Sequence, residues 1–310
     1  MGGCMHRSLR PIALSGLLLG SQLLATAALA QTSEGLSPTL TRIKNAHVVR
    51  LGYRESSPPF SFLDQANRPI GYSLELCEAV VDEIGVEVDD PSLKIEYVKV
   101  TSDDRIQAVL QDKIDLECGS TTANADRAKK VAFSPLMFVA GTKLMVPKAS
   151  IVQSVTDLKG RIVVVTKGTT NEQAMHNADK KFSLGLNIVT ADDHEQSYQM
   201  LADGKADAFA TDDILLYGLI ARHKAQDKFR VAGDYLSYDP YGIMFKRAEP
   251  QLAAVVERAF RKLGSNHDLI PLYEKWFVRR LPTGERLNVA ISPQLEEAFH
   301  SMDDSPGANN

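Results

Sequence analysis

The chain alternates short β-branched segments with segments of helical periodicity, and it does so in two successive runs. In the first run, the expected strands and helices are 47–53, 73–84, 94–100, 102–111 and 114–118. Ser102 is the expected N-cap of the second helix, and residues 56–60 carry two prolines and are expected to form a loop. Strands that alternate with helices predict an α/β unit.

A second run of the same kind follows. Its expected strands are 141–146, 161–166, 187–190, 206–211, 230–232 and 241–246, and its expected helices are 170–178, 195–203, 214–223, 251–263 and 269–277. Each run contains a strand that ends in a Gly-Ser-Thr or Gly-Thr-Thr loop, from which a helix begins. Ligands bind at the carboxyl ends of strands in open α/β sheets, so two such lobes facing each other would form a cleft.

The N-terminus has the pattern of an export signal. Arg7 and Arg10 precede an apolar stretch over 11–28, and an A-x-A motif closes it at 28–30. We expect residues 1–30 to be a signal peptide that is cut after Ala30, so the mature protein would be exported. The alternative is an uncleaved membrane anchor.

Composition excludes several classes of protein. The 310 residues suit two lobes, and 44% hydrophobic and 24% charged residues are ordinary for a globular chain. The net charge of −4 argues against nucleic acid as a partner. No Cys or His cluster has zinc spacing, and no phosphate-binding glycine motif occurs, so no metal or cofactor is expected. Cys77 and Cys118 could pair in an oxidising compartment or remain two buried thiols.

Two hydroxyl-rich loops are the first candidates for ligand binding. Ser120 and Thr122 follow one expected strand, and Thr166 and Thr169 follow another. Free N–H groups at a helix N-terminus attract anions, and hydroxyls add donors. For any one of these residues, simple helix capping is the competing interpretation. Two such clusters at equivalent positions favour an anion-binding cleft.

Charged side chains near the same strand ends extend this pattern. Arg54, Arg105 and Arg127 each follow a strand, and arginine binds carboxylates through paired hydrogen bonds. A solvated surface charge is the alternative for each. Asp212 or its neighbour Asp213 could accept an ammonium group, while the other caps a helix. No acid pair or nucleophile motif indicates catalysis.

Several segments in order resemble a known family. They are Gly52-Tyr-Arg-Glu-Ser-Ser-Pro-Pro-Phe60, Glu117-Cys-Gly-Ser-Thr-Thr122 with Arg127, Thr166-Lys-Gly-Thr-Thr170, Ala191-Asp-Asp-His194, Asp212-Asp213, Tyr241-Gly-Ile-Met and Tyr273-Glu-Lys-Trp-Phe277. Over residues 45–280 the chain resembles the periplasmic amino-acid-binding proteins of ABC importers, most of all their glutamate/aspartate-binding branch.

The resemblance implies an α/β fold of two lobes, the type II periplasmic-binding-protein fold, with two hinge crossings and a ligand cleft between the lobes. Lobe 1 would comprise residues 45–140 and 242–280, and lobe 2 would comprise 141–241. Outside the range of this resemblance, the polar composition of residues 31–45 indicates a leader, and that of 281–310 indicates an extension that wraps the surface or frays. The partners implied are an acidic amino acid and an inner-membrane ABC permease, with the protein itself a monomer.

The resemblance also implies a role for each site residue. Arg127 would bind the ligand α-carboxylate with Ser120, Thr122 and Thr169, and Asp212 would bind the α-ammonium. The group around the side-chain carboxylate would be Arg54, Ser102, Arg105, Thr166 and His194. Some members carry a Cys near the position of Ile243 that could pair with the one matching Cys118, whereas here only Cys77 could do so.

Charge complementarity supports the acidic ligand independently. Glutamate brings two negative charges and one positive, which three arginines and one aspartate complement, and a neutral ligand would leave a buried guanidinium unpaired. One methylene is worth only ~1 kcal/mol, so the sequence does not separate glutamate from aspartate. Two alternative functions remain open at this point: a periplasmic enzyme similar to cyclohexadienyl dehydratases, and a sensory amino-acid receptor.

Overall fold

The computed structural model describes Met1 and residues 35–302, and those from Leu36 onward belong to one compact unit. The expected signal peptide, with its cleavage point after Ala30, lies outside the described residues. No helix within the described part of the chain is long and apolar enough to cross a membrane.

The first sheet has the strand order β5-β1-β6-β15-β7. Its strands are β1 (Val48–Tyr53), β5 (Lys94–Lys99), β6 (Leu116–Glu117), β7 (Val131–Phe133) and β15 (Met244–Lys246). β1 runs parallel to β5 and β6, whereas β15 runs antiparallel to β6 and β7. β15 follows all strands of the second sheet in the sequence but belongs to the first sheet. The first lobe is therefore built from two separate segments of the chain.

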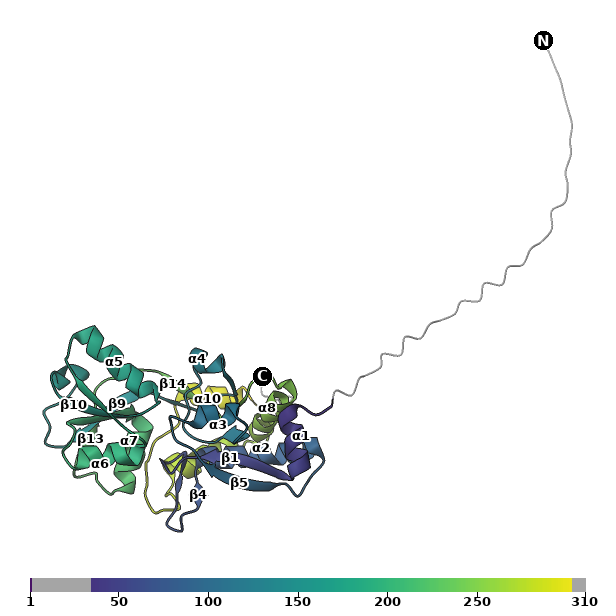
Figure 1. Ribbon diagram of the computed structural model, residues 1–310, viewed down its shortest axis with the longest axis horizontal. Helices are drawn as coiled ribbons and strands as arrows, with labels where there is room; N and C mark the ends of the chain where they lie inside the picture. The colour runs from purple at the N-terminus through teal and green to yellow at the C-terminus, as the bar shows by residue number, and fades with distance from the viewer. Residues whose placement is uncertain (2–34, 303–310) are drawn as a thin grey trace. The chain divides into compact units, whose positions relative to one another are not determined.

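Helices cover this sheet and bury its apolar side chains. They are α1 (Pro38–Ala46), α2 (Tyr72–Val88), α3 (Arg105–Leu110), α4 (Ala125–Ala128), α8 (Pro250–Ser265), α9 (Leu269–Tyr273) with a π-helical turn (Glu274–Val278), and α10 (Pro293–His300). Figure 1 shows α1, α2 and α8 beside β1 and β5. Three short strands, β2 (Ser56–Ser57), β3 (Ser61–Leu63) and β4 (Pro69–Ile70), form a small separate sheet.

The second sheet has the order β11-β10-β12-β9-β13. Its elements are β9 (Thr142–Pro147), a 3-10 turn (Val155–Leu158), β10 (Ile162–Thr166), α5 (Thr170–Phe182), β11 (Asn187–Ala191), α6 (His194–Ala202), β12 (Ala208–Asp212), α7 (Asp213–Arg222) and β13 (Phe229–Ala232). Alternate residues of β10 face opposite layers: Val163 and Val165 share a core with Met175 of α5, and Val164 shares one with Leu216 of α7. Figure 1 shows α5 and α6 on either side of these strands.

Two antiparallel strands carry the chain between the sheets. β8 (Phe138–Ala140) leads out of the first sheet into β9, and β14 (Asp239–Tyr241) leads back toward β15. Phe138 and Tyr241 of this ribbon pack among Phe60, Tyr273 and Phe277, all aromatic residues of the first lobe. The fold is therefore the two-lobe α/β arrangement that the sequence predicts, with two crossings.

The structure corrects several predicted elements. Residues 38–46 form α1 instead of a leader, with Leu40 and Ile43 buried. The predicted strand 241–246 is two strands, because β14 pairs with β8 while β15 pairs with β6 and β7. Ser56 and Ser57 pair as a strand, so the segment before the two prolines is not loop throughout.

Two further predictions were wrong in detail. Ser102 does not cap α3, because that helix begins at Arg105 with Asp104 at the N-cap position. The segment after Leu281 does not simply wrap the surface, because α10 buries Leu295 and Phe299 in the core of the first lobe.

A disulfide settles the question of the two cysteines. Cys77 of α2 and Cys118, which follows β6, are bonded with their Cα atoms 6.2 Å apart. The bond fixes the helix to the strand end from which the Gly119-Ser120 loop begins. It therefore ties the core of the first lobe to one of the two hydroxyl-rich loops.

Candidate functional site

A narrow cavity, with little empty space inside it, lies where the two lobes meet. Its lining comes from loops and helix starts of both lobes: Ser102, Arg105, Ser120, Thr122, Arg127, Thr169, Thr170, Asn171, His194, Asp212 and Leu215. Eight of the ten residues predicted from the sequence are in this lining. The two exceptions are Arg54 and Thr166.

Both exceptions lie directly behind the lining. Arg54 is buried and donates to the hydroxyl of Ser102, which does line the cavity. The hydroxyl of Thr166 is 2.8 Å from that of Ser197, and the Thr166 carbonyl accepts from Thr169. In this structure both residues support lining residues and do not line the cavity themselves.

The three arginines are not neutralised by salt bridges. Arg127 donates to the carbonyls of Thr122 at 2.9 Å and Gly168 at 3.4 Å, and Arg105 donates to the carbonyl of Ser102. None of the three forms a salt bridge with a carboxylate within residues 35–302. The cavity is therefore surrounded by guanidinium groups that hold only backbone and hydroxyl partners.

Burial makes this cluster favourable for an anion. The pKa of Arg105 lies well below its usual value because the group is buried, and the charges of Arg127 and Arg54 lower it further. Burial also lowers the pKa values of Arg54 and Arg127. A bound carboxylate would offset this repulsion, and a neutral guest would not.

Asp212 is the acidic group of the lining, and two donors hold its carboxylate. Asn171 donates to Oδ1 at 2.7 Å, and the hydroxyl of Tyr241 donates to Oδ2. Burial, followed by the nearby charge of Asp239, raises the pKa of Asp212 to about 7. A ligand ammonium would favour the charged carboxylate, so this position suits an amine. The side chain of Asp212 caps no helix, and neighbouring Asp213 instead accepts from Tyr235.

His194 offers a neutral polar group. Burial, followed by the charges of Arg54 and Arg105, holds the pKa of its ring well below the usual value. Its Nδ1 lies 3.3 Å from the hydroxyl of Ser57, while Nε2 has no partner among the described residues. In the tautomer whose Nδ1 accepts from Ser57, Nε2 carries the hydrogen and can donate to a carboxylate.

The loop at residues 167–170 brings the second lobe against the first. Gly168 has a positive φ of 73°, and a Cβ there would lie 2.7 Å from the Cα of Asp103. Lys167 pairs with Asp103 at 2.8 Å, and the hydroxyls of Thr170 and Thr122 are 3.2 Å apart. These contacts close one side of the cavity.

Sequence reasoning missed three lining residues. Thr170 belongs to a recognised hydroxyl loop but was not predicted as part of the site. Asn171 is buried in the first turn of α5, where it joins Asp212 and Thr142. The signal that could have found Asn171 is its place directly after that loop, since a polar residue there faces the strand ends. Leu215 gives no such signal in the sequence.

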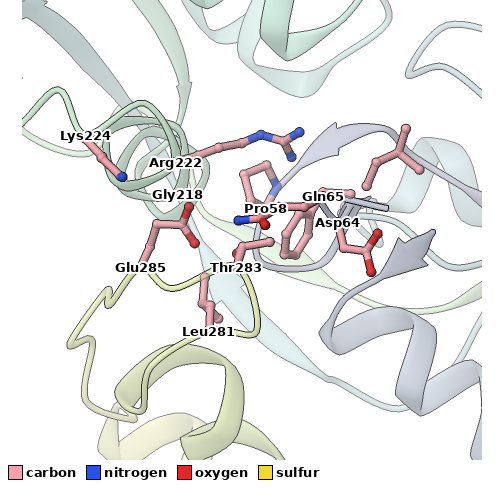
Figure 2. A pocket seen from close by; sticks show the side chains of 11 residues that line it. Pro58, Asp64, Gln65, Gly218, Arg222, Lys224, Leu281, Thr283 and Glu285 are labelled. Carbon is pink, nitrogen blue, oxygen red and sulfur yellow. The ribbon is translucent and has the colours of Figure 1, made fainter. Parts of the chain in front are cut away.

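A larger cavity, of about 300 Å³, contains none of the predicted site residues. Figure 2 shows that Gly218 and Arg222 of α7 lie on one side of it and the turn with Thr283 and Glu285 on another. The Arg222 guanidinium stands 5.7 Å from the ring of Phe62, which meets Trp276 edge to face at 6.0 Å. Both signs of charge occur in the lining, so this cavity lacks the positive bias of the first.

No group of three or more His, Cys, Asp or Glu within the described ranges could hold a metal ion. The cavity lining itself carries donors for anions and one carboxylate. Its chemistry is therefore that of a binding site for a small molecule with both acidic and basic groups.

Known proteins are similar to this chain in sequence. Residues 49–279 match the model of the bacterial extracellular solute-binding proteins, family 3. The chain belongs to this family. An L-glutamate/L-aspartate-binding protein of Pseudomonas aeruginosa is 40% identical over 276 residues, which cover 88% of this chain and 91% of that protein. A glutamate/aspartate import solute-binding protein of Salmonella typhimurium is 32% identical over 96% of this chain and 98% of its own length.

Solved structures of other amino-acid-binding proteins share the fold. An ancestral arginine-binding protein bound to arginine superposes with a TM-score of 0.68 at 28% identity and covers 74% of this chain and 98% of its own. Since that protein was solved with a basic amino acid, the two-lobe fold does not by itself fix the charge of the ligand. Within this family, the side chains of the cavity must decide it.

Proposed function

We propose that this chain is a periplasmic receptor that captures glutamate or aspartate and delivers it to an inner-membrane ABC permease. The observation that carries the proposal is that Arg105, Arg127 and Asp212 line one cavity, with Arg54 buried directly behind its lining. Two carboxylates and one ammonium are the charges that this set complements. The P. aeruginosa and S. typhimurium relatives are named for the same two amino acids, and the second is named as an import protein.

Each part of the ligand has a matching group of side chains. Arg127, with Ser120, Thr122 and Thr169, would bind the α-carboxylate, and Asp212 would bind the α-ammonium. The side-chain carboxylate would meet Arg105 and His194. Ser120 supports its assignment, because its hydroxyl is buried and has no partner among the described residues. The remaining residues around the side-chain carboxylate would be Ser102, which lines the cavity, and Arg54 and Thr166, which support the lining.

Opening and closing of the lobes would admit the ligand. β8 and β14 are the two crossings, so a hinge there would move residues 141–241 against residues 45–140 and 242–280. Closure would bring the loop around Gly168 onto Ser102 and Asp103 and remove water from the arginines. A monomer contains the complete site, since both lobes belong to one chain.

Calorimetry on the mature chain, beginning at Gln31, tests the proposal. Glutamate, aspartate, glutamine and histidine are titrated separately at pH 7.5. We expect binding of the two acidic amino acids at micromolar or lower Kd and at least hundredfold weaker binding of the other two. Equal affinity for glutamine and glutamate would show that the arginines do not select the ligand.

The relatives named above are binding proteins, and this favours a receptor over an enzyme on the same fold. The cavity supports this choice, because its one lining carboxylate, Asp212, is held by Asn171 and Tyr241 in a position suited to an ammonium group. The S. typhimurium relative is named as an import protein, and import requires a receptor that releases its ligand chemically unchanged.

A further inference from the structure

A second carboxylate lies beneath the arginines and has no place in the proposed ligand contacts. Glu117, the last residue of β6, is fully buried. Neither of its carboxylate oxygens has a hydrogen-bond partner in the part of the chain that the structure describes. A buried, unpartnered carboxylate is costly, so its presence calls for a compensating charge.

The compensating charges are the cavity arginines. Burial lowers the pKa values of Arg54, Arg127 and Arg105, and the negative charge of Glu117 opposes this effect at all three. Contact with the loop is close as well: a Cβ at Gly119 would collide with Oε1 of Glu117 and with the stem of Arg54. Glu117 is not part of the cavity lining, and its charge therefore acts on all three guanidinium groups from outside it.

We propose that Glu117 is a specificity-determining residue: an internal counter-anion that stabilises the arginine cluster in the ligand-free protein and limits its affinity for acidic amino acids. The inference rests on the proposed function, since it assumes a ligand with two carboxylates. A fixed negative charge behind the arginines lowers the positive potential in the cavity. It opposes the second carboxylate of glutamate but has little effect on the neutral amide of glutamine.

If Glu117 has this role, removing its charge should lower the stability of the ligand-free protein and raise its affinity for glutamate. Glu117→Gln keeps the size of the side chain and removes its charge. The ligand-free variant should melt several degrees lower, because the arginines lose their counter-charge. Its affinity for glutamate should rise at least about fivefold, while its affinity for glutamine changes less than about twofold. A purely structural residue would lower stability without raising the preference for glutamate.

Asp115→Asn is the matched control. Asp115 is buried on the same segment, but it pairs with Arg42 at 2.6 Å and Arg50 at 3.2 Å and not with the cavity. Its loss should lower the melting temperature and leave the ratio of glutamate to glutamine affinity unchanged. Calorimetry and thermal melting of wild type and both variants give all the required values.

A double variant tests the counter-charge if Glu117→Gln alone does not fold. Adding Arg54→Gln removes one positive charge together with the negative one, so the double variant should fold where Glu117→Gln does not, and melt above it where it does. A double variant that melts lower overturns the inference, as does an unchanged or reduced ratio of glutamate to glutamine affinity in Glu117→Gln. Wild-type protein that does not prefer glutamate would instead refute the proposed function.

Discussion

The cavity arginines donate to carbonyls and hydroxyls, and these partners leave their charges uncompensated by any direct salt bridge in the described ranges. Because the groups are buried, that charge acts strongly on any guest. Single side chains can therefore be assigned to different ends of the ligand by their effects on different amino acids.

Arg127 and Arg105 should be separable in this way. Arg127→Ala removes the partner of the α-carboxylate, which all amino acids share, and each charge-assisted hydrogen bond is worth about 1.5–3 kcal/mol. We expect glutamate and glutamine affinities to fall together by about a hundredfold or more. Arg105→Ala should weaken glutamate at least tenfold and glutamine little. Calorimetry measures both, with Arg50→Ala as a control outside the cavity; equal losses in both cavity variants would contradict the roles.

Asp212 should make binding depend on pH. Its folded-state pKa of about 7 lies above the value near 3.9 of an exposed aspartate, so without ligand it takes up a proton as pH falls through 7. A ligand ammonium requires the charged form, so glutamate affinity should weaken roughly tenfold per pH unit below 7 and level off above it. For the same reason, this residue's contribution to the stability of the ligand-free fold declines as pH rises from about 4 to 7.

Isothermal titrations between pH 5.5 and 8.5 check this dependence. The carboxylate faces Asp239, Tyr241 and Asp213, and Asp212→Asn separates its titration from theirs. The variant should bind weakly with a flat profile over this range. A flat profile in the wild-type protein would rule out Asp212 as the titrating ammonium partner.

How far the sequence predicts the site depends on where each side chain lies. Arg105, Ser120 and His194 follow strand ends, and the carboxyl edge of a sheet is where ligands gather, so their place in the lining could be anticipated. Glu117 could not be, because it lies within a strand and its burial beneath the arginines depends on how two loops pack. Thr166 ends a strand, yet its hydroxyl turns to Ser197.

At the scale of elements, helices with a strong apolar periodicity are predicted correctly from the sequence, and helices with a weak one are not. α2 and α8 are long and were expected close to their observed positions. α1 was missed because only Leu40 and Ile43 are large buried apolar residues in a polar segment, and α10 has only Leu295 and Phe299. Both short helices depend on packing against the first lobe for their stability.

The disulfide between α2 and the end of β6 should stabilise the first lobe. It closes a loop with a sequence separation of 41 residues, for which chain entropy predicts about 4 kcal/mol of stabilisation. We expect the free energy of unfolding to fall by about 3–4 kcal/mol in the double variant Cys77→Ala, Cys118→Ala.

Chemical denaturation of both proteins, with and without reductant, measures this difference. Reductant should destabilise wild type and leave the double variant unchanged. The ratio of glutamate to glutamine affinity should stay the same, because neither sulfur lines the cavity. Equal stability of wild type and the double variant without reductant would mean that the bond does not constrain the unfolded chain.

At the scale of the whole molecule, the two lobes also contact each other outside the cavity lining. Besides the cavity lining, Lys167 pairs with Asp103, Ser57 approaches His194, and the helix position Gly218 admits the backbone of Pro58. Such contacts would form on closure and favour the closed state whichever amino acid is bound.

Lys167→Gln should therefore weaken all ligands alike. The pair with Asp103 is half exposed, so its effect is modest, and we expect a two- to fivefold loss of affinity for glutamate at low salt. The difference from wild type should shrink as salt screens the pair. Titrations at two ionic strengths test this, and Lys205→Gln, which breaks an exposed pair within one lobe, is the control. A change in the ratio of glutamate to glutamine affinity would place Lys167 among the selective residues instead.

The chain has a single tryptophan, Trp276, and it packs on Phe62, whose ring also meets Arg222 from the other lobe. Only the ring of Phe62 thus separates the indole from Arg222 of the second lobe, and the indole itself is buried in the first lobe. Its emission should respond when the domains rearrange, without any introduced dye. The protein consequently carries its own optical reporter, suited to stopped-flow measurement of how quickly the cleft shuts.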